Sequence, residues 1–418
     1  MILNSKTFRI VILLFLSACS SSSEREAFFA TASNPGMNSA SGTAVETETP
    51  TGLAATISSV MTVEPVDSAI LETPSVLPDL AQDSAAAEDL RPLQLQDYLA
   101  QLAESGQFMG VVFIAQNGQI LIDDGFGMAD IEDGRPNTAQ TQLRIGSLTK
   151  QFTAAAILRL QELGRLNVND TINVYLPNYP GGEQITIHQL LTHTAGVPNY
   201  TTRSDLATVV QTPISLQDLL SQSSNQPLEF TPGQQFAYSD SGYVILTAII
   251  EAVSGMSYAD FLQEQFFNKL GMVNTGYDYL NDNLAESATG YNLTPGGPQR
   301  AVDTESSWAS GAGALYSTVG DLYLWDQALN DNQILNADSL KSMFTTWVGM
   351  GQGYSYGYGW EIGHLAGRPV QTHAGNIFGF GSFMARFPED DATIIILGNG
   401  LQLSPRMIAE ELANILFS

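Results

Sequence analysis

Cysteine and lysine are both scarce in this sequence. Its one cysteine, Cys19, excludes any internal disulfide. Only four of the 418 residues are lysines, and 16 Lys and Arg residues stand against 43 Asp and Glu residues, for a net charge of −27. This charge argues against nucleic acid or an anionic membrane surface as a partner, because both would repel the chain. Among so few lysines, Lys150, three residues after Ser147, is harder to ascribe to chance.

The N-terminus has the features of a secretory signal. A basic start precedes an apolar run, Ile10–Leu16, that is too short to span a bilayer. The Leu-Ser-Ala-Cys sequence that ends at Cys19 resembles the bacterial lipobox. The resemblance implies a signal peptide over residues 1–18, cleavage before Cys19 and a lipid anchor on its thiol. Ser20 then points to the outer membrane, facing the periplasm. An ordinary signal peptide with an incidental cysteine is the alternative.

Residues 19–91 are rich in Ser, Thr, Ala, Pro and acidic residues, and they show no sustained hydrophobic period. This composition predicts a disordered, self-repelling linker. The folded domain is therefore expected over residues 92–418, which is long enough to bury a full core.

Hydrophobic periodicity predicts an α+β domain. Apolar residues from Leu95 to Leu102 line one face of a helix. Two strand-like runs then flank Asn117-Gly118, a strong hairpin signal. Residues from about 165 to 350 are mostly helical in pattern, after which strands return and a last helix ends the chain. We expect an antiparallel β-sheet built from N- and C-terminal segments and flanked by helices, with a mostly helical subdomain inserted.

The stretch RIGSLTKQF places Ser147 and Lys150 one turn apart at the start of a predicted helix. A serine hydroxyl needs a base before it can act as a nucleophile, and a lysine three positions on projects from the same helix face. The positive end of the helix dipole and a backbone N–H there would help to hold an oxyanion. The alternative is a helix-capping serine beside a surface lysine.

Two later segments carry candidate partners. Tyr238 and Asp240 precede a predicted helix, and a tyrosine hydroxyl between cations can have its pKa lowered enough to act as acid and base. His373 and Gly375 stand at a predicted strand, where glycine permits close backbone approach to a ligand and a strand edge can supply an oxyanion N–H. Taken alone, each pair is also explained by ring packing, helix capping or a turn.

Three short motifs of this chain resemble, in the same order, the three motifs of the serine β-lactamase and penicillin-binding protein superfamily. They are Ser147-x-x-Lys150, Tyr238-x-Asp240 and His373-Ala374-Gly375. More closely, the chain resembles class C β-lactamase-related serine hydrolases, which include D-Ala-D-Ala carboxypeptidases, D-aminopeptidases and esterases.

The resemblance implies a role for each motif residue. Ser147 would be acylated, Lys150 would transfer its proton, and Tyr238 would be catalytic. Asp240, His373 and Gly375 would lie at the substrate. The N–H of Ser147 and a second N–H near Phe378–Gly381 would hold the oxyanion.

Two residues depart from that pattern. Asp240 stands where the family most often has asparagine, and a carboxylate cannot donate a hydrogen bond, favours the charged form of Lys150 and repels a substrate carboxylate. His373 replaces the lysine of β-lactamases, and a neutral imidazole attracts a carboxylate less. Both changes weaken the case for penicillin or cephalosporin hydrolysis and favour neutral or cationic acyl substrates.

Two other patterns are set aside. Ser355 lies in a G-x-S-x-G sequence, but a strand pattern follows it where a nucleophile elbow needs a helix. His188 and His193 lack a third ligand, so we expect a packed, hydrogen-bonded His193 rather than a metal site. No metal or organic cofactor is expected.

The expected function is that of an envelope-anchored serine hydrolase. It would form an acyl-enzyme on Ser147 with a small-molecule or peptidoglycan-derived substrate, namely an ester, a D-amino acid peptide or a β-lactam. The alternative is a catalytically weak penicillin- or peptidoglycan-binding protein, or a sensor, of the same fold.

Overall fold

The computed structural model describes residues 89–277, 284 and 286–418. The predicted signal peptide, Cys19 and nearly all of the predicted linker lie outside the described residues. Helix α1 (Arg91–Glu104) begins within one residue of the expected domain start and has a proline in its first turn, where the missing N–H is not needed.

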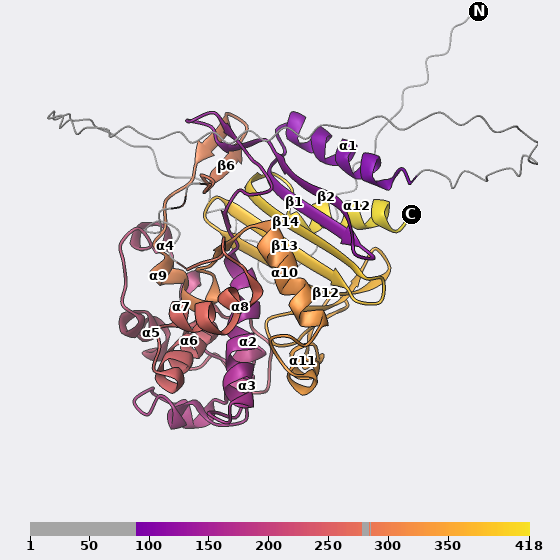
Figure 1. Ribbon diagram of the computed structural model, residues 1–418. Helices are drawn as coiled ribbons and strands as arrows, with labels where there is room; N and C mark the ends of the chain where they lie inside the picture. Colours follow the sequence, from indigo (N-terminus) through magenta and orange to yellow (C-terminus); the bar gives the residue numbers. More distant parts are fainter. Residues whose placement is uncertain (1–88, 278–283, 285) are drawn as a thin grey trace, which may run out of the picture. The chain divides into compact units, whose positions relative to one another are not determined.

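An eight-stranded antiparallel sheet forms the centre of the domain, and both ends of the folded chain contribute to it (Figure 1). The first strand pairs with the last along its whole length, from Phe108 with Leu401 to Gln116 with Ala392. The predicted sheet of N- and C-terminal segments is therefore confirmed. In order across the sheet the strands are β2 (Gln119–Phe126), β1 (Phe108–Gln116), β14 (Ala392–Leu401), β13 (Phe380–Phe387), β12 (Arg368–Ile377), β11 (Glu361–Leu365), β10 (Tyr354–Tyr356) and β9 (Val348–Gly351).

The β1–β2 hairpin turns at the predicted Asn117-Gly118 pair. Both residues have positive φ, 51° and 71°, as a two-residue hairpin turn of the favoured twist requires. Helix α12 (Pro405–Leu416) ends the chain.

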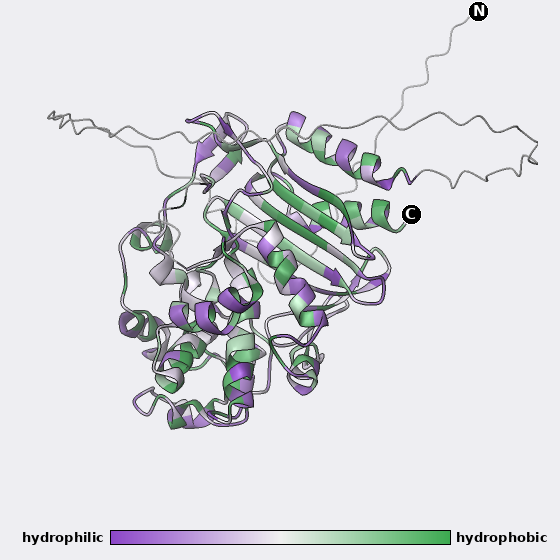
Figure 2. Cartoon of the chain, viewed as in Figure 1, coloured by the Kyte–Doolittle hydropathy of each residue, from purple (hydrophilic) through white to green (hydrophobic). Residues whose placement is uncertain are grey.

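Helices cover both faces of the sheet, so its central strands are buried on both sides. On β1, Val112 and Ile114 belong to the hydrophobic cluster with α1 and α12, whereas Val111 and Phe113 belong to the cluster on the other face. This alternation follows from the two-residue period of a strand. Because both faces are apolar, the strands are almost continuously hydrophobic, as their colour in Figure 2 shows.

Between the hairpin and the last six strands, the chain is mostly helical, as predicted. Helix α7 continues through a π-helical turn, Gln263–Phe267, and Gly271 ends this segment with φ of 72°. The helices of this part are α2 (Thr149–Glu162), α3 (Ile187–Leu191), α4 (Leu206–Val209), α5 (Leu216–Ser224), α6 (Asp240–Ser254), α7 (Tyr258–Leu262), α8 (Asn268–Leu270), α9 (Ser306–Ala309), α10 (Val319–Asn330) and α11 (Ala337–Met343).

Short strand pairs complete the fold. The pairing of β5 (Leu143–Arg144) with β8 (Tyr316–Ser317) brings the segment before α10 beside the start of α2. The other pairs are β3 (Met128–Asp130) with β4 (Arg135–Pro136), and β6 (Tyr291–Thr294) with β7 (Gly297–Arg300).

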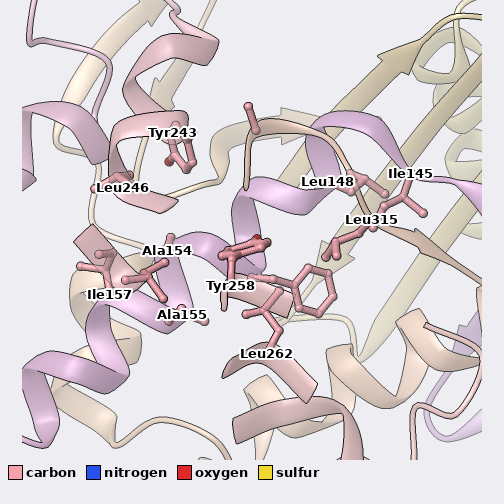
Figure 3. Packing of buried hydrophobic residues seen from close by; sticks show 14 of the residues in the cluster. Ile145, Leu148, Ala154, Ala155, Ile157, Tyr243, Leu246, Tyr258, Leu262 and Leu315 are labelled. Atoms are coloured by element: carbon pink, nitrogen blue, oxygen red, sulfur yellow. The ribbon is translucent and has the colours of Figure 1, made fainter. Parts of the chain in front are cut away.

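Helix α2 lies at the centre of the larger hydrophobic cluster. Every residue from Thr149 to Leu158 is buried. Ala154, Ala155 and Ile157 belong to one cluster with side chains of α6 and α7, several of which are labelled in Figure 3. Burial on all sides holds this helix in one place, and with it the residues at its N-terminus. The tryptophans Trp325 and Trp360 are fully buried, and Trp308 nearly so, as expected of core residues.

Among the described residues, no single helix is both long and apolar enough to cross a membrane. Helix α6 and the segment Tyr258–Leu270 meet that test only together, as a pair bent by 75°.

Candidate active site

Ser147 lies in a short 3-10 turn, η2 (Gly146–Leu148), that leads into α2. The predicted helix therefore starts two residues later than expected, at Thr149, and neither the turn nor the helix has a side-chain cap. From Thr141 to Leu158, Ser147 is the one residue that is not buried. A serine that is held by a buried helix, is itself only partly buried and caps no helix is placed as a nucleophile must be. The helix-cap interpretation is wrong.

Lys150 is fully buried and approaches three oxygens. Its Nζ lies 3.1 Å from Oγ of Ser147, 2.7 Å from Oδ1 of Asp240 and 2.7 Å from the carbonyl oxygen of Ala312. Burial lowers the pKa of Lys150, and the charge and hydrogen bond of Asp240 oppose that change. The surface-lysine interpretation is therefore wrong, and Lys150 is close enough to Ser147 to exchange a proton with it.

Asp240 is held by the segment after α3. Its Oδ2 accepts a hydrogen bond from Oγ1 of Thr201 (3.2 Å), and its backbone N–H donates to Oδ1 of Asn199 (3.2 Å). The carboxylate thus has one oxygen on Lys150 and the other on a hydroxyl. This arrangement compensates the charge of the buried lysine inside the site.

Tyr238 stands next to both Ser147 and Lys150. The Nζ of Lys150 is 4.8 Å from the centre of its ring, and a side-chain hydrogen bond joins it to Ser147. Burial and the Asp240 carboxylate raise the pKa of Tyr238 well above its usual value, although the bond to Ser147 opposes them. A lowered pKa was expected from flanking cations. That expectation is wrong, because burial and then the negative charge of Asp240 both raise the pKa of Tyr238.

His373 is close to Tyr238, but its ring is enclosed. The two ring centroids are 6.3 Å apart, and His373 is 1% exposed. Its Nδ1 donates to the carbonyl oxygen of Ala374 (2.7 Å), which leaves Nε2 to accept from the hydroxyl of Tyr356 (2.9 Å). Burial, and then the charge of Lys150, lower the pKa of His373 to about 3. The ring is neutral and occupied by internal partners, so the structure does not present it to a substrate.

Gly375 brings strand β12 against the nucleophile turn. A Cβ atom at this position would lie 2.2 Å from the carbonyl oxygen of Ile145, 2.3 Å from Oγ of Ser382 and 3.0 Å from the backbone N of Ser147. The close backbone approach predicted at Gly375 is therefore observed toward the chain that carries Ser147.

Asn376 is the β12 residue next to the same turn. Its backbone N lies 2.9 Å from the Cβ position of Gly146, and Asn376 is exposed. Strand β11 pairs with β12 only as far as Thr372, so the edge beyond it has no strand partner among the described residues. The second N–H was expected near Phe378–Gly381, but those residues lie at the β12–β13 turn and in β13, which pairs with β12 and β14.

Sequence reasoning missed two parts of this site. The first is the carbonyl oxygen of Ala312, which accepts a hydrogen bond from Lys150. Every residue has this backbone group, so the sequence could not indicate its role. His193 was expected only to pack, and it is buried with hydrogen bonds as predicted, yet its ring also lies 4.2 Å from that of Tyr238. Ser355 lies on β10, which bears out its rejection as a nucleophile. No group of metal-ligating side chains occurs in the described parts of the chain.

Comparison with known proteins agrees with this geometry. A family model described as Beta-lactamase matches residues 95–416. Penicillin-binding protein 4* of Bacillus subtilis is 32% identical over 329 residues, which cover 73% of this chain and 71% of that protein.

Solved structures show the same fold. An octameric penicillin-binding protein homologue from Pyrococcus abyssi superimposes with a TM-score of 0.70 at 27% identity, over 79% of this chain and 78% of that one. A D-amino acid amidase from Ochrobactrum anthropi SV3 superimposes with a TM-score of 0.70 at 23% identity. The superposition covers 78% of this chain and 98% of the amidase chain. The chain belongs to the beta-lactamase family and has the fold of its penicillin-binding-protein-like serine hydrolases.

Proposed function

We propose that the protein hydrolyses acyl substrates through an acyl-enzyme on Ser147. The observation that carries the proposal is the buried Lys150 Nζ, 3.1 Å from the Oγ of a serine that is itself only partly buried. Burial favours the uncharged lysine that can accept a proton.

In the proposed acylation step, Ser147 Oγ bonds to the substrate carbonyl carbon and its proton passes to Lys150, after which the bond between that carbon and the leaving group breaks. The neutral Tyr238, whose pKa is raised, serves as a hydrogen-bonding relay that returns a proton to the leaving group. Water then attacks the carbonyl carbon of the acyl-enzyme and gives a proton to Lys150 or Tyr238. The bond between that carbon and Ser147 Oγ breaks, and the proton returns to Oγ. The N–H groups of Ser147 and Asn376 are the donors proposed for the oxyanion.

The charges at the site favour substrates without a carboxylate near the scissile bond. Lys150 is already paired with Asp240, and His373 is neutral and enclosed. A substrate carboxylate would meet Asp240, whose charge neither Lys150 nor His373 is free to offset in the described part of the chain. We therefore propose esters and D-amino acid amides as the substrate class, in preference to penicillins and to peptides with a free C-terminal carboxylate. The likeness to the D-amino acid amidase is consistent with this choice.

The decisive experiment is labelling of purified protein with a fluorophosphonate, followed by peptide mass spectrometry. We expect the adduct on Ser147, and none in Ser147→Ala protein with an unchanged circular dichroism spectrum. Ester hydrolysis should also fall in that variant by at least about a thousandfold. An adduct on another serine, or full activity in Ser147→Ala, would refute the assignment.

One observation favours the second candidate, a weakly catalytic binding or sensor protein. Asp240 opposes deprotonation of Lys150. This would slow both the acylation of Ser147 and the hydrolysis of the acyl-enzyme. Under that alternative, the fluorophosphonate or a β-lactam would label Ser147 once, and no ester or D-amino acid amide would be turned over repeatedly.

We further propose that the mature protein is anchored to the bacterial envelope through a lipid on Cys19. The motif that ends at Cys19 is the support for this proposal. In a bacterial host, the parent protein should sediment with membranes and Cys19→Ala protein should not. Equal membrane association of the two would contradict the anchor.

A further inference from the structure

His193 has no part in the proposed chemistry, yet it contacts the chain on both sides of Tyr238. Its backbone carbonyl accepts a hydrogen bond from the N–H of Ala237 (3.0 Å). Its ring Nδ1 accepts another from the N–H of Ser239 (3.2 Å). Between these two bonds, its ring lies against the ring of Tyr238, with centroids 4.2 Å apart and planes inclined by 33°. A single residue therefore holds the backbone before and after Tyr238 and supports its side chain.

His193 makes these contacts in a conformation that few residues tolerate. Its φ is 56°, in the left-handed region where side chains other than glycine are strained, with histidine, asparagine and aspartate the most tolerated. It is 2% exposed. Its Nε2 has no hydrogen-bond partner among the described residues. A residue that served only to fill space would not need a strained backbone and an unpaired buried nitrogen.

The neutral form of His193 is the one that can accept the Ser239 hydrogen bond. Burial, followed by the charge of Lys150, holds the pKa of His193 well below its usual value. The neutral ring then carries its proton on Nε2 and leaves the Nδ1 lone pair for the backbone. Aromatic rings surround it, since Tyr356 and Tyr243 have centroids 4.7 Å and 5.1 Å away.

We propose that His193 is a positioning residue for Tyr238. It takes no part in the bond changes itself, and it holds the backbone and ring of Tyr238 so that the tyrosine hydroxyl meets Ser147. This inference rests on the proposed function, because it gives His193 a role only if Tyr238 takes part in the reaction. A displacement of a catalytic group by about 1 Å can cost about a hundredfold in rate, so loss of this support should be visible in kcat.

Two substitutions separate the contacts of His193. His193→Phe keeps a ring beside Tyr238 but removes the Nδ1 acceptor, whereas His193→Asn keeps a side-chain acceptor and tolerates positive φ but removes the ring. We expect His193→Phe to lower kcat for ester hydrolysis by about 10- to 100-fold, with KM changed less than about threefold. His193→Asn should recover part of that loss. His188→Phe is the matched control, because His188 is hydrogen-bonded to Tyr358 through its own Nδ1, and its kcat should change less than about twofold.

A double-mutant cycle with Tyr238→Phe completes the test. If His193 acts through Tyr238, adding His193→Phe or His193→Asn to Tyr238→Phe should change kcat less than about twofold further. Losses that multiply in the double variant would overturn the positioning role and leave the proposed function intact. The same conclusion follows if both His193 variants keep the parental kcat. A Tyr238→Phe variant with full activity would instead refute the role of Tyr238 in the reaction, and the inference would fall with it. If His193→Phe does not fold, the cycle with His193→Asn by itself tests whether His193 acts through Tyr238.

Discussion

The Nζ of Lys150 lies 2.7 Å from Oδ1 of Asp240, with the lysine side chain fully buried and the aspartate side chain 19% exposed. The two residues are 90 positions apart in the chain. A buried lysine alone would lose its proton readily, and a carboxylate beside it restrains that loss. We therefore expect the charge of this pair to influence both the reactivity of Ser147 and the charge of acceptable substrates.

Replacing Asp240 with asparagine should speed acylation of Ser147 by penicillins. The amide can donate to a substrate carbonyl, no longer repels a carboxylate and lets the pKa of Lys150 fall further. We expect the acylation rate to rise by about tenfold or more, measured by intact-protein mass spectrometry. Asp97→Asn, at an exposed site on α1, is the control. A rate no higher than that of the parent would show that Asp240 does not set this specificity.

A methyl group at Gly375 should separate β12 from the nucleophile turn. The added Cβ would overlap the carbonyl oxygen of Ile145 at 2.2 Å, so the strand or the turn must move. We expect Gly375→Ala to lower kcat for ester hydrolysis by about a hundredfold and to cost about 1–3 kcal/mol of stability. Gly349 on β9 has no atom within 4 Å of its Cβ position, so Gly349→Ala should keep the parental rate. Equal rates in the two variants would rule out this steric role.

The enclosed His373 should make the protein less stable in acid. Its pKa is about 3 in the folded protein and about 6.5 when unfolded, so between these values the unfolded chain binds the extra proton. This group therefore makes the free energy of unfolding fall as the pH drops from about 6.5 toward 3, by up to about 1.4 kcal/mol per pH unit.

His373→Gln should remove that contribution and give a shallower decline of stability in this pH range. Urea denaturation of parent and variant at pH 7, 6, 5 and 4 measures the difference. The comparison cancels the other titrating groups, including His193. Parallel pH curves would mean that His373 can be protonated in the folded state.

Asp326 should matter for stability rather than catalysis. It pairs with Arg386, and their side chains are 2% and 3% exposed; it also accepts a hydrogen bond from Thr393 (2.8 Å). Asp326→Ala would leave the buried Arg386 guanidinium without its carboxylate partner. We expect the free energy of unfolding, measured by urea denaturation, to fall by about 3–5 kcal/mol. Asp303→Ala breaks the exposed pair with Arg300 and should cost less than about 1 kcal/mol. Similar losses in both variants would contradict the importance of burial here.

Local patterns in the sequence predicted the elements well. The Asn117-Gly118 turn and the apolar runs around it are signals that neighbouring residues carry by themselves, and the hairpin is present as predicted. The Ser147–Lys150 spacing likewise predicted their proximity, because residues three apart share a helix face. The start of α2 was less well predicted, since a 3-10 turn and an α-helix have almost the same local pattern.

The errors concern groups whose properties depend on distant neighbours. Tyr238 was expected to have a lowered pKa, but burial and then the charge of Asp240 raise it. His373 was expected at the substrate, but Tyr356 and Ala374 occupy both of its nitrogens. Gly375 was expected to allow the backbone close to a ligand, and only the structure shows that its Cβ position lies against the backbone of Ile145.

By itself, the sequence determined the order of strands and helices, the serine that begins the central helix and the lysine one turn beyond it. These are properties of adjacent residues, set by backbone period and side-chain spacing. Only the tertiary structure decided the directions in which the pKa values of Lys150, Tyr238 and His373 shift, and the contacts of His193 with the residues on either side of Tyr238. Those depend on which distant segments exclude water from a group and which charges they place beside it, and packing alone sets both.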